Sequence, residues 1–128
     1  MMTSRYLFAV VFTLTIFSTA SAQEQNKPMV RLARLVIDST QLEQYNAFLK
    51  EEIETSVKVE PGVLTLYAMA EKNRPAHITI LEIYASDDAY KKHIQTPHFL
   101  KYKLGTKDMV KSLELAETVP LIPAMKIK

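Results

Sequence analysis

The chain has 128 residues, with 16 lysines and arginines against 14 aspartates and glutamates, and a formal net charge of +2. With charges this nearly balanced, the chain lacks the excess of positive charge that binding to nucleic acid or to an anionic membrane surface would need. Because the chain has no cysteine, it can form no disulfide, no thiolate metal site and no thiol nucleophile.

The N-terminus has the pattern of a secretory signal peptide. Arg5 precedes an apolar run at residues 6–17, and small residues follow it up to Ala20-Ser21-Ala22. The run is too short to cross a bilayer. We therefore expect cleavage before Gln23 and export across the inner membrane to the periplasm; an uncleaved membrane anchor is the alternative.

Removal of the first 22 of the 128 residues would leave 106, the size of one domain. No internal repeat or second domain is evident. The predicted organisation is a signal peptide at 1–22, a disordered segment at 23–28, a single domain at 29–123 and a C-terminal tail at 124–128.

The first predicted elements are a strand and a helix. An apolar run at 30–37 indicates the strand. Thr40 and Glu43 have the spacing of a capping box, and apolar residues then recur at helical spacing over 42–57. Glu60-Pro61-Gly62 ends this helix.

Two strands are predicted next, at 63–69 and 77–84, and a polar turn at 71–75 joins them as a hairpin. Ile78 and Ile80 lie on one face of the second strand, whereas the alternate residues of the other face are also apolar.

The last predicted elements are two short helices and a strand. Ser86 caps the first helix, and Thr96, followed by Pro97, caps the second. The final strand is predicted at 113–122, where prolines favour a sheet edge.

The order β-α-β-β-α-β predicts an α+β fold, the ferredoxin-like split β-α-β arrangement with a four-stranded antiparallel sheet. Helices can cover one face of such a sheet. Because the other face is apolar as well, we expect a second copy of the sheet to cover it, giving a homodimer of the dimeric α/β-barrel type.

The densest group of chemically useful side chains lies between Glu82 and Tyr102. His93 shares a helix face with Ala89 and Tyr90, which points it toward the sheet. Glu82 and Tyr84 share a strand face. The sequence therefore predicts a pocket between this helix and this strand.

Four stretches carry a family resemblance: Glu82-Ile83-Tyr84, His93-Ile94-Gln95-Thr96-Pro97-His98-Phe99, Lys101-Tyr102 and Glu60-Pro61-Gly62. Together they resemble the antibiotic biosynthesis monooxygenase family, in particular its quinol monooxygenase branch, over roughly 30–120. The resemblance implies a ferredoxin-like dimer. It also implies oxidation or oxygenation of phenolic or quinol-type aromatics by molecular oxygen, without metal, flavin or haem.

A quinol reduces oxygen more readily once it is deprotonated, so such an enzyme needs a base near neutral pH and an apolar pocket for a flat ring. The candidate catalytic residues are His93 as the base, Tyr84 and Glu82. The candidate substrate-binding residues are His98, Phe99, Tyr67, Met69 and Arg34.

Each candidate has a structural alternative. His93 can be a histidine hydrogen-bonded at the edge of the core, and His98 a helix-start or surface residue. The aromatic candidates can be core residues. Glu82 can pair with Lys91 or Arg34, and Arg34 can form an interface salt bridge.

No metal or cofactor is expected. His93 and His98 are five apart with a proline between them, so they cannot form the i, i+4 zinc pair of one helix. Haem binding or degradation is a less favoured alternative, since the chain lacks the tryptophan on which haem-degrading relatives rely. The main rival is a non-catalytic dimer that binds a small apolar ligand.

Overall fold

The computed structural model describes residues 27–122. The predicted signal peptide, its cleavage site and the predicted tail lie outside this range. In chain order the elements are β1 (Met29–Ile37), the 3-10 turn η1 (Ser39–Gln41), α2 (Leu42–Val59), β2 (Val63–Glu71), β3 (Arg74–Tyr84), α3 (Asp87–His93), α4 (Pro97–Thr106) and β4 (Val110–Thr118). None of the helices in 27–122 combines the length and apolar composition needed to cross a membrane.

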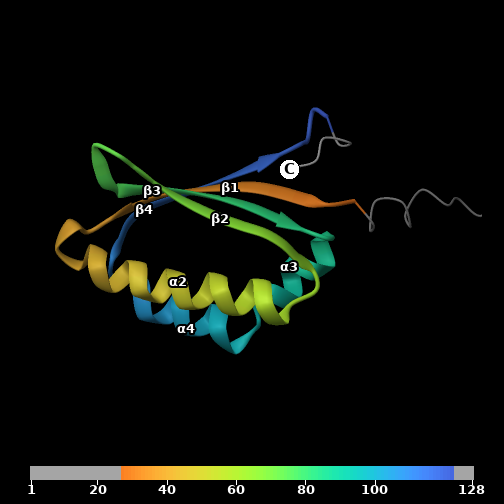
Figure 1. Cartoon of the computed structure of the whole chain (residues 1–128), viewed down its shortest axis with the longest axis horizontal. Coiled ribbons are helices and arrows are strands. Elements are labelled where there is room, and N and C mark those ends of the chain that lie inside the picture. The colour runs from red at the N-terminus through yellow and green to blue at the C-terminus, as the bar shows by residue number, and fades with distance from the viewer. Residues whose placement is uncertain (1–26, 123–128) are drawn as a thin grey trace, which may run out of the picture.

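The four strands form one antiparallel sheet in the order β2-β3-β1-β4. This is the predicted ferredoxin-like α+β fold. Helices α2 and α4 lie side by side under one face of the sheet, and α3 lies near one end of it (Figure 1). Within the described range, no helix covers the other face, which we call the outer face.

The central strand β1 fixes which side chains meet the helices. Arg31, Ala33, Leu35 and Ile37 alternate toward them and are buried. The register places Ile80 opposite Ala33, and both Ile78 and Ile80 are buried, as the sequence predicted.

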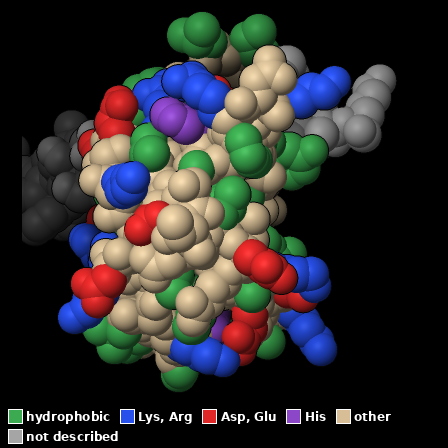
Figure 2. All heavy atoms as spheres, turned by 90° about the vertical axis from the view of Figure 1, so that its left-hand side faces the viewer, with side chains coloured by type: hydrophobic (Ala, Val, Ile, Leu, Met, Phe, Trp, Pro, Cys, Tyr) green, Lys and Arg blue, Asp and Glu red, His purple; other side chains and the backbone are tan. Residues whose placement is uncertain are grey.

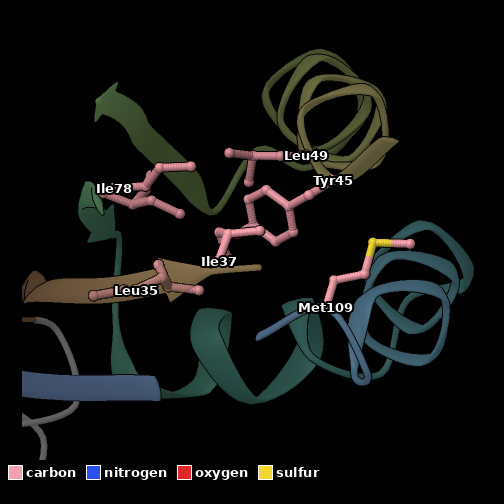
Figure 3. Close-up of a cluster of buried hydrophobic side chains, with 8 residues drawn as sticks. Leu35, Ile37, Tyr45, Leu49, Ile78 and Met109 are labelled. Atoms are coloured by element: carbon pink, nitrogen blue, oxygen red, sulfur yellow. The ribbon is translucent and has the colours of Figure 1, made fainter. Parts of the chain in front are cut away.

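The main core lies where α2 and α4 meet the sheet. Tyr45 of α2 is fully buried and packs with Leu49, Ile37, Ile78 and Met109 (Figure 3). Burying one such side chain contributes roughly 1.5–3 kcal/mol, so this cluster fixes α2 on the sheet.

The start of α2 differs from the predicted capping box. Asp38 is the capping residue: its carboxylate accepts a hydrogen bond from the backbone N–H of Thr40 at 3.0 Å. The 3-10 turn follows, and Gln41, which precedes α2, makes no side-chain capping bond. Thr40 and Glu43 therefore form no capping box.

The other two caps are as predicted. Ser86 Oγ accepts from the N–H of Ala89 at 3.0 Å, and Thr96 Oγ1 accepts from the N–H of Phe99 at 3.3 Å. The last strand begins and ends earlier than predicted, because its pairing with β1 runs from Ile37–Val110 to Val30–Thr118.

The outer face remains apolar in a single chain. It carries Tyr67 and Met69 of β2, which pair with Leu81 and Thr79 of β3 and are 62% and 44% exposed. One end of the molecule, which includes the β2–β3 turn, instead shows acidic and basic side chains interspersed with hydrophobic ones (Figure 2).

Candidate functional site

A cavity of about 380 Å³ lies between the helix-facing side of the sheet and the helices. Its floor is apolar and includes Ala33, Leu35 and Ile80, with Leu113 and Leu115 at the open β4 edge. Its polar end is formed by Arg31, Glu52, Glu82, Tyr84, Tyr90 and His93. An apolar chamber with a few convergent polar groups is the usual form of a small-molecule site.

His93 ends α3 and is 2% exposed. Its ring lies 5.3 Å from the ring of Tyr84 and 5.1 Å from that of Phe99, measured between centroids. The helix face predicted for His93 therefore does point it at the sheet, and the ring lines the cavity.

Glu60, just after α2, joins both site histidines. One oxygen of its carboxylate lies 2.9 Å from Nδ1 of His93 and 2.7 Å from Nε2 of His98. Burial alone would raise the pKa of Glu60, but the hydrogen bonds from His98 and His93 hold it below its ordinary value. An ionised oxygen accepts from both rings, so the tautomer of neutral His93 that fits this contact has its proton on Nδ1 and its acceptor at Nε2.

Gly62 brings this carboxylate to α3. The N–H of Ala85 bonds the carbonyl of Gly62 at 2.8 Å. A Cβ at Gly62 would lie only 2.7 Å from Cβ of Ala89, so the close approach of the turn to α3 requires glycine.

Glu52 lies on the other side of the His93 ring. Its Oε1 is 3.3 Å from Nε2 of His93 and accepts a hydrogen bond from Ser56 Oγ at 2.8 Å. Burial raises the pKa of Glu52, against the opposing effects of Ser56 and His93. The imidazole thus lies between two carboxylates of different acidity, an arrangement suited to acid–base work.

The sequence predictions missed Glu52, Ser56 and Glu60. A signal was present, because Tyr45, Leu49, Glu52 and Ser56 are the buried residues of one face of α2. Polar residues in an otherwise apolar stripe are expected to have buried partners.

Tyr84 and Glu82 form a second polar pair. The Tyr84 hydroxyl donates to Oε2 of Glu82 at 3.3 Å. Burial raises the pKa of both groups, so Tyr84 remains a hydrogen-bond donor. Neither of the predicted partners pairs with Glu82: Lys91 pairs with Asp87 at 2.7 Å and Arg34 with Glu114 at 3.1 Å.

The structure brings together four of the predicted site residues, since His93, Tyr84, Glu82 and Phe99 all line the cavity. His98 forms a hydrogen bond with Glu60 and does not line the cavity. The remaining three candidates, Tyr67, Met69 and Arg34, do not reach the cavity, because the strand registers place them on the outer face.

Glu60, His93 and His98 are also the group of described residues that could hold a metal ion, with one ligand atom from each lying within 4.8 Å of the others. The short contacts to Glu60 are already accounted for as hydrogen bonds, and a metal would have to displace both ring protons.

The antiparallel sheet, with its helices on one face and a cavity between sheet and helices, makes this a ferredoxin-like α+β protein with a small-molecule cavity. The family model described as antibiotic biosynthesis monooxygenase matches residues 28–103. The chain therefore belongs to the antibiotic biosynthesis monooxygenase family.

Solved structures agree with this assignment. A candidate antibiotic biosynthesis monooxygenase from Bacteroides thetaiotaomicron is 65% identical, with a TM-score of 0.79, over 80% of this chain and 97% of that one. A candidate monooxygenase from Lactobacillus acidophilus is 30% identical, with a TM-score of 0.72, over 74% of this chain and 45% of that one.

A further family protein, from Nitrosomonas europaea, is 18% identical with a TM-score of 0.70 over 77% of this chain and 95% of that one, and shows the fold alone. No curated protein matches the chain.

Proposed function

We propose that the protein is a cofactor-independent monooxygenase or oxidase that uses molecular oxygen to oxidise a quinol-like or phenolic aromatic. One observation carries the proposal: His93 is held between Glu60 and Glu52 at the polar end of an apolar cavity large enough for a ring. Family membership and the relatives described as monooxygenases support the reaction class.

In the proposed first step, Nε2 of His93 takes the proton of a ring hydroxyl. Glu60 holds the opposite nitrogen as N–H and so fixes the orientation of the ring. The imidazolium that forms lies between Glu60 and Glu52, whose carboxylates stabilise its charge.

In the second step, the aromatic anion gives electrons to oxygen. A quinol transfers two electrons and both hydroxyl protons, yielding quinone and hydrogen peroxide. A phenol that gains one oxygen atom yields quinone and water, and both balances close without another reductant. The Tyr84 hydroxyl, which burial keeps protonated, is the proposed donor to a ring or oxygen-derived oxygen atom, and its hydrogen would turn from Glu82 to that atom.

The test is oxygen uptake by the purified protein with a panel of reduced benzoquinones and naphthoquinones, followed by assay of peroxide and quinone. We expect uptake above the autoxidation rate, unchanged by a chelator and without added flavin. Uptake no faster than autoxidation, together with saturable binding of the oxidised quinones, would instead favour the non-catalytic binding module.

We also propose that two copies pair through the outer face. Tyr67 and Met69 leave it substantially apolar and exposed in one chain, and an antiparallel sheet gains by covering such a face. Export to the periplasm remains part of the proposal, and a secreted form whose mass corresponds to a start at Gln23 would support it.

A further inference from the structure

We propose that the cavity is selective for a hydroxyaromatic that also carries a carboxylate, and that Arg31 receives this group. The inference deepens the proposed function by naming a substrate class, and it rests on that function only for the reaction that follows binding.

Arg31 is a buried cation in the middle of the sheet. It lies on the central strand β1, is 6% exposed and lines the polar end of the cavity. Sequence reasoning passed over it because it sits in an otherwise apolar run. A buried guanidinium is expected to have its charge and its donors satisfied.

The contacts of Arg31 with the described residues leave its buried Nε donor without a partner. One terminal nitrogen lies 3.4 Å from a carboxylate oxygen of Glu117, a side chain that is 80% exposed. The guanidinium carbon lies 4.4 Å above the ring of Tyr90. Its Nε is buried and has no hydrogen-bond partner in the described part of the chain.

The two strand neighbours of Arg31 do not supply that partner. Glu82 and Glu117 lie opposite Arg31 in the registers with β3 and β4, but no acceptor oxygen of either reaches Nε. An acceptor oxygen from a bound molecule would satisfy Nε, and a carboxylate is the acceptor that also matches the charge.

The opening of the cavity is basic. Three lysines line it: Lys103 of α4, Lys107 directly after α4, and Lys111 near the start of β4. None of the three forms an ion pair with another residue in 27–122. The carboxylates in the lining are Glu52, which is buried, and Glu82, which is half-buried, and both lie at the polar end. An anionic ligand is therefore attracted at the entrance.

Aromatic packing connects Arg31 to the proposed base. Tyr90, under the guanidinium, packs on Tyr84 with centroids 5.3 Å apart, and Tyr84 packs on His93 at 5.3 Å. Arg31 and His93 are therefore linked through one series of aromatic contacts, and both line the same cavity. A hydroxyaromatic carboxylate in this cavity can direct its carboxylate toward Arg31 and its hydroxyl toward His93.

The test is anaerobic calorimetry with three matched probes: hydroquinone, 2,5-dihydroxybenzoate and the neutral methyl ester of the latter. We expect 2,5-dihydroxybenzoate to bind about 10–100-fold more tightly than either neutral probe, the range expected for a hydrogen bond to a charged group. Arg31→Gln should abolish this preference, and Arg74→Gln, in an exposed ion pair with Glu71 at the β2–β3 turn, should preserve it.

Equal affinity of the unmutated protein for the acid and its ester would overturn the inference, and this comparison needs no variant to fold. So would a preference that survives Arg31→Gln in a protein with an unchanged circular dichroism spectrum. Because binding is measured without oxygen, the two proposals can fail separately. Selective binding of the acid with no turnover would refute the proposed reaction and leave the carboxylate site standing. Turnover of hydroquinone with no preference for the acid would refute the carboxylate site and leave the proposed reaction standing.

Discussion

The carboxylate of Glu60 lies 2.9 Å from Nδ1 of His93 and fixes which nitrogen of that ring faces the cavity. The same oxygen also accepts from His98 at 2.7 Å. A single residue after α2 thus orients one histidine from the end of α3 and another from the start of α4. The consequences for activity, stability and assembly can each be measured.

Replacing Glu60 with glutamine should lower kcat by about 10–100-fold, because the imidazolium loses a charge-assisted hydrogen bond. The pH dependence of kcat should move with it, which a merely structural role would not produce. Glu54→Gln is the matched control, since Glu54 pairs with Lys50 on the exposed side of α2. An unchanged kcat and pH profile in Glu60→Gln would rule out this positioning role.

Glu52 should make the protein less stable as pH rises. Burial raises its pKa in the folded state, so its contribution is fully present below the ordinary carboxyl pKa and is lost as pH rises through the raised value. The Glu52→Gln side chain still accepts a hydrogen bond from Ser56. Because it does not ionise, it does not lose stability as pH rises. The free energy of unfolding of the Glu52→Gln protein, relative to the unmutated protein, should therefore increase over the pH range that begins at the ordinary carboxyl pKa of 4.5 and extends upward.

Urea unfolding across that range measures the difference. Glu60, whose pKa is lowered, gives the opposite slope in a more acidic window, because its contribution is lost as pH falls through the lowered value. Glu51→Gln, on an exposed carboxylate paired with Lys101, is the control. If the plots of unfolding free energy against pH were parallel for the unmutated and Glu52→Gln proteins, the effect assigned to the burial of Glu52 would be contradicted.

The outer face can be tested by charge. Tyr67→Glu should convert a dimer into a monomer or an aggregate, because a carboxylate would be buried against the second sheet. Sedimentation velocity measures the outcome. Val57→Glu, at an apolar position that is 51% exposed on α2, should leave the dimer intact. A stable monomer in the unmutated protein would refute the proposed assembly.

The fold could be predicted from sequence because its signals are local. The caps at Ser86 and Thr96 and the helical spacing that turns His93 inward each depend on a few adjacent residues. The exception at Asp38 arose because a 3-10 turn intervenes before α2, and sequence spacing alone does not distinguish that turn from the helix.

The faces of β2 could not be predicted in the same way. Period-two alternation along 63–69 would place Val63 and Tyr67 on the same face, but the pairing with β3 shifts between Val63 and Thr65. One extra residue reverses every later side chain, so Tyr67 and Met69 lie on the outer face and Leu66 lines the cavity.

Glu60 was missed for a different reason. Its role depends on a contact across 33 positions with His93 and 38 with His98. In the sequence, Glu60 is part of the turn that ends the helix, and this turn alone explains its presence. The position of its carboxylate becomes clear only from the packing of Gly62 against α3.

The most direct test of the account compares oxygen uptake by the unmutated protein and by His93→Ala, with a quinol that the unmutated protein oxidises. His77→Ala is the matched control, because His77 lies on the outer face opposite Val36. A general base contributes about 10²–10⁴-fold, so His93→Ala should lose that factor while its circular dichroism spectrum and the rate of His77→Ala stay unchanged. Equal rates for the unmutated and His93→Ala proteins would contradict the account and leave His93 as a structural residue.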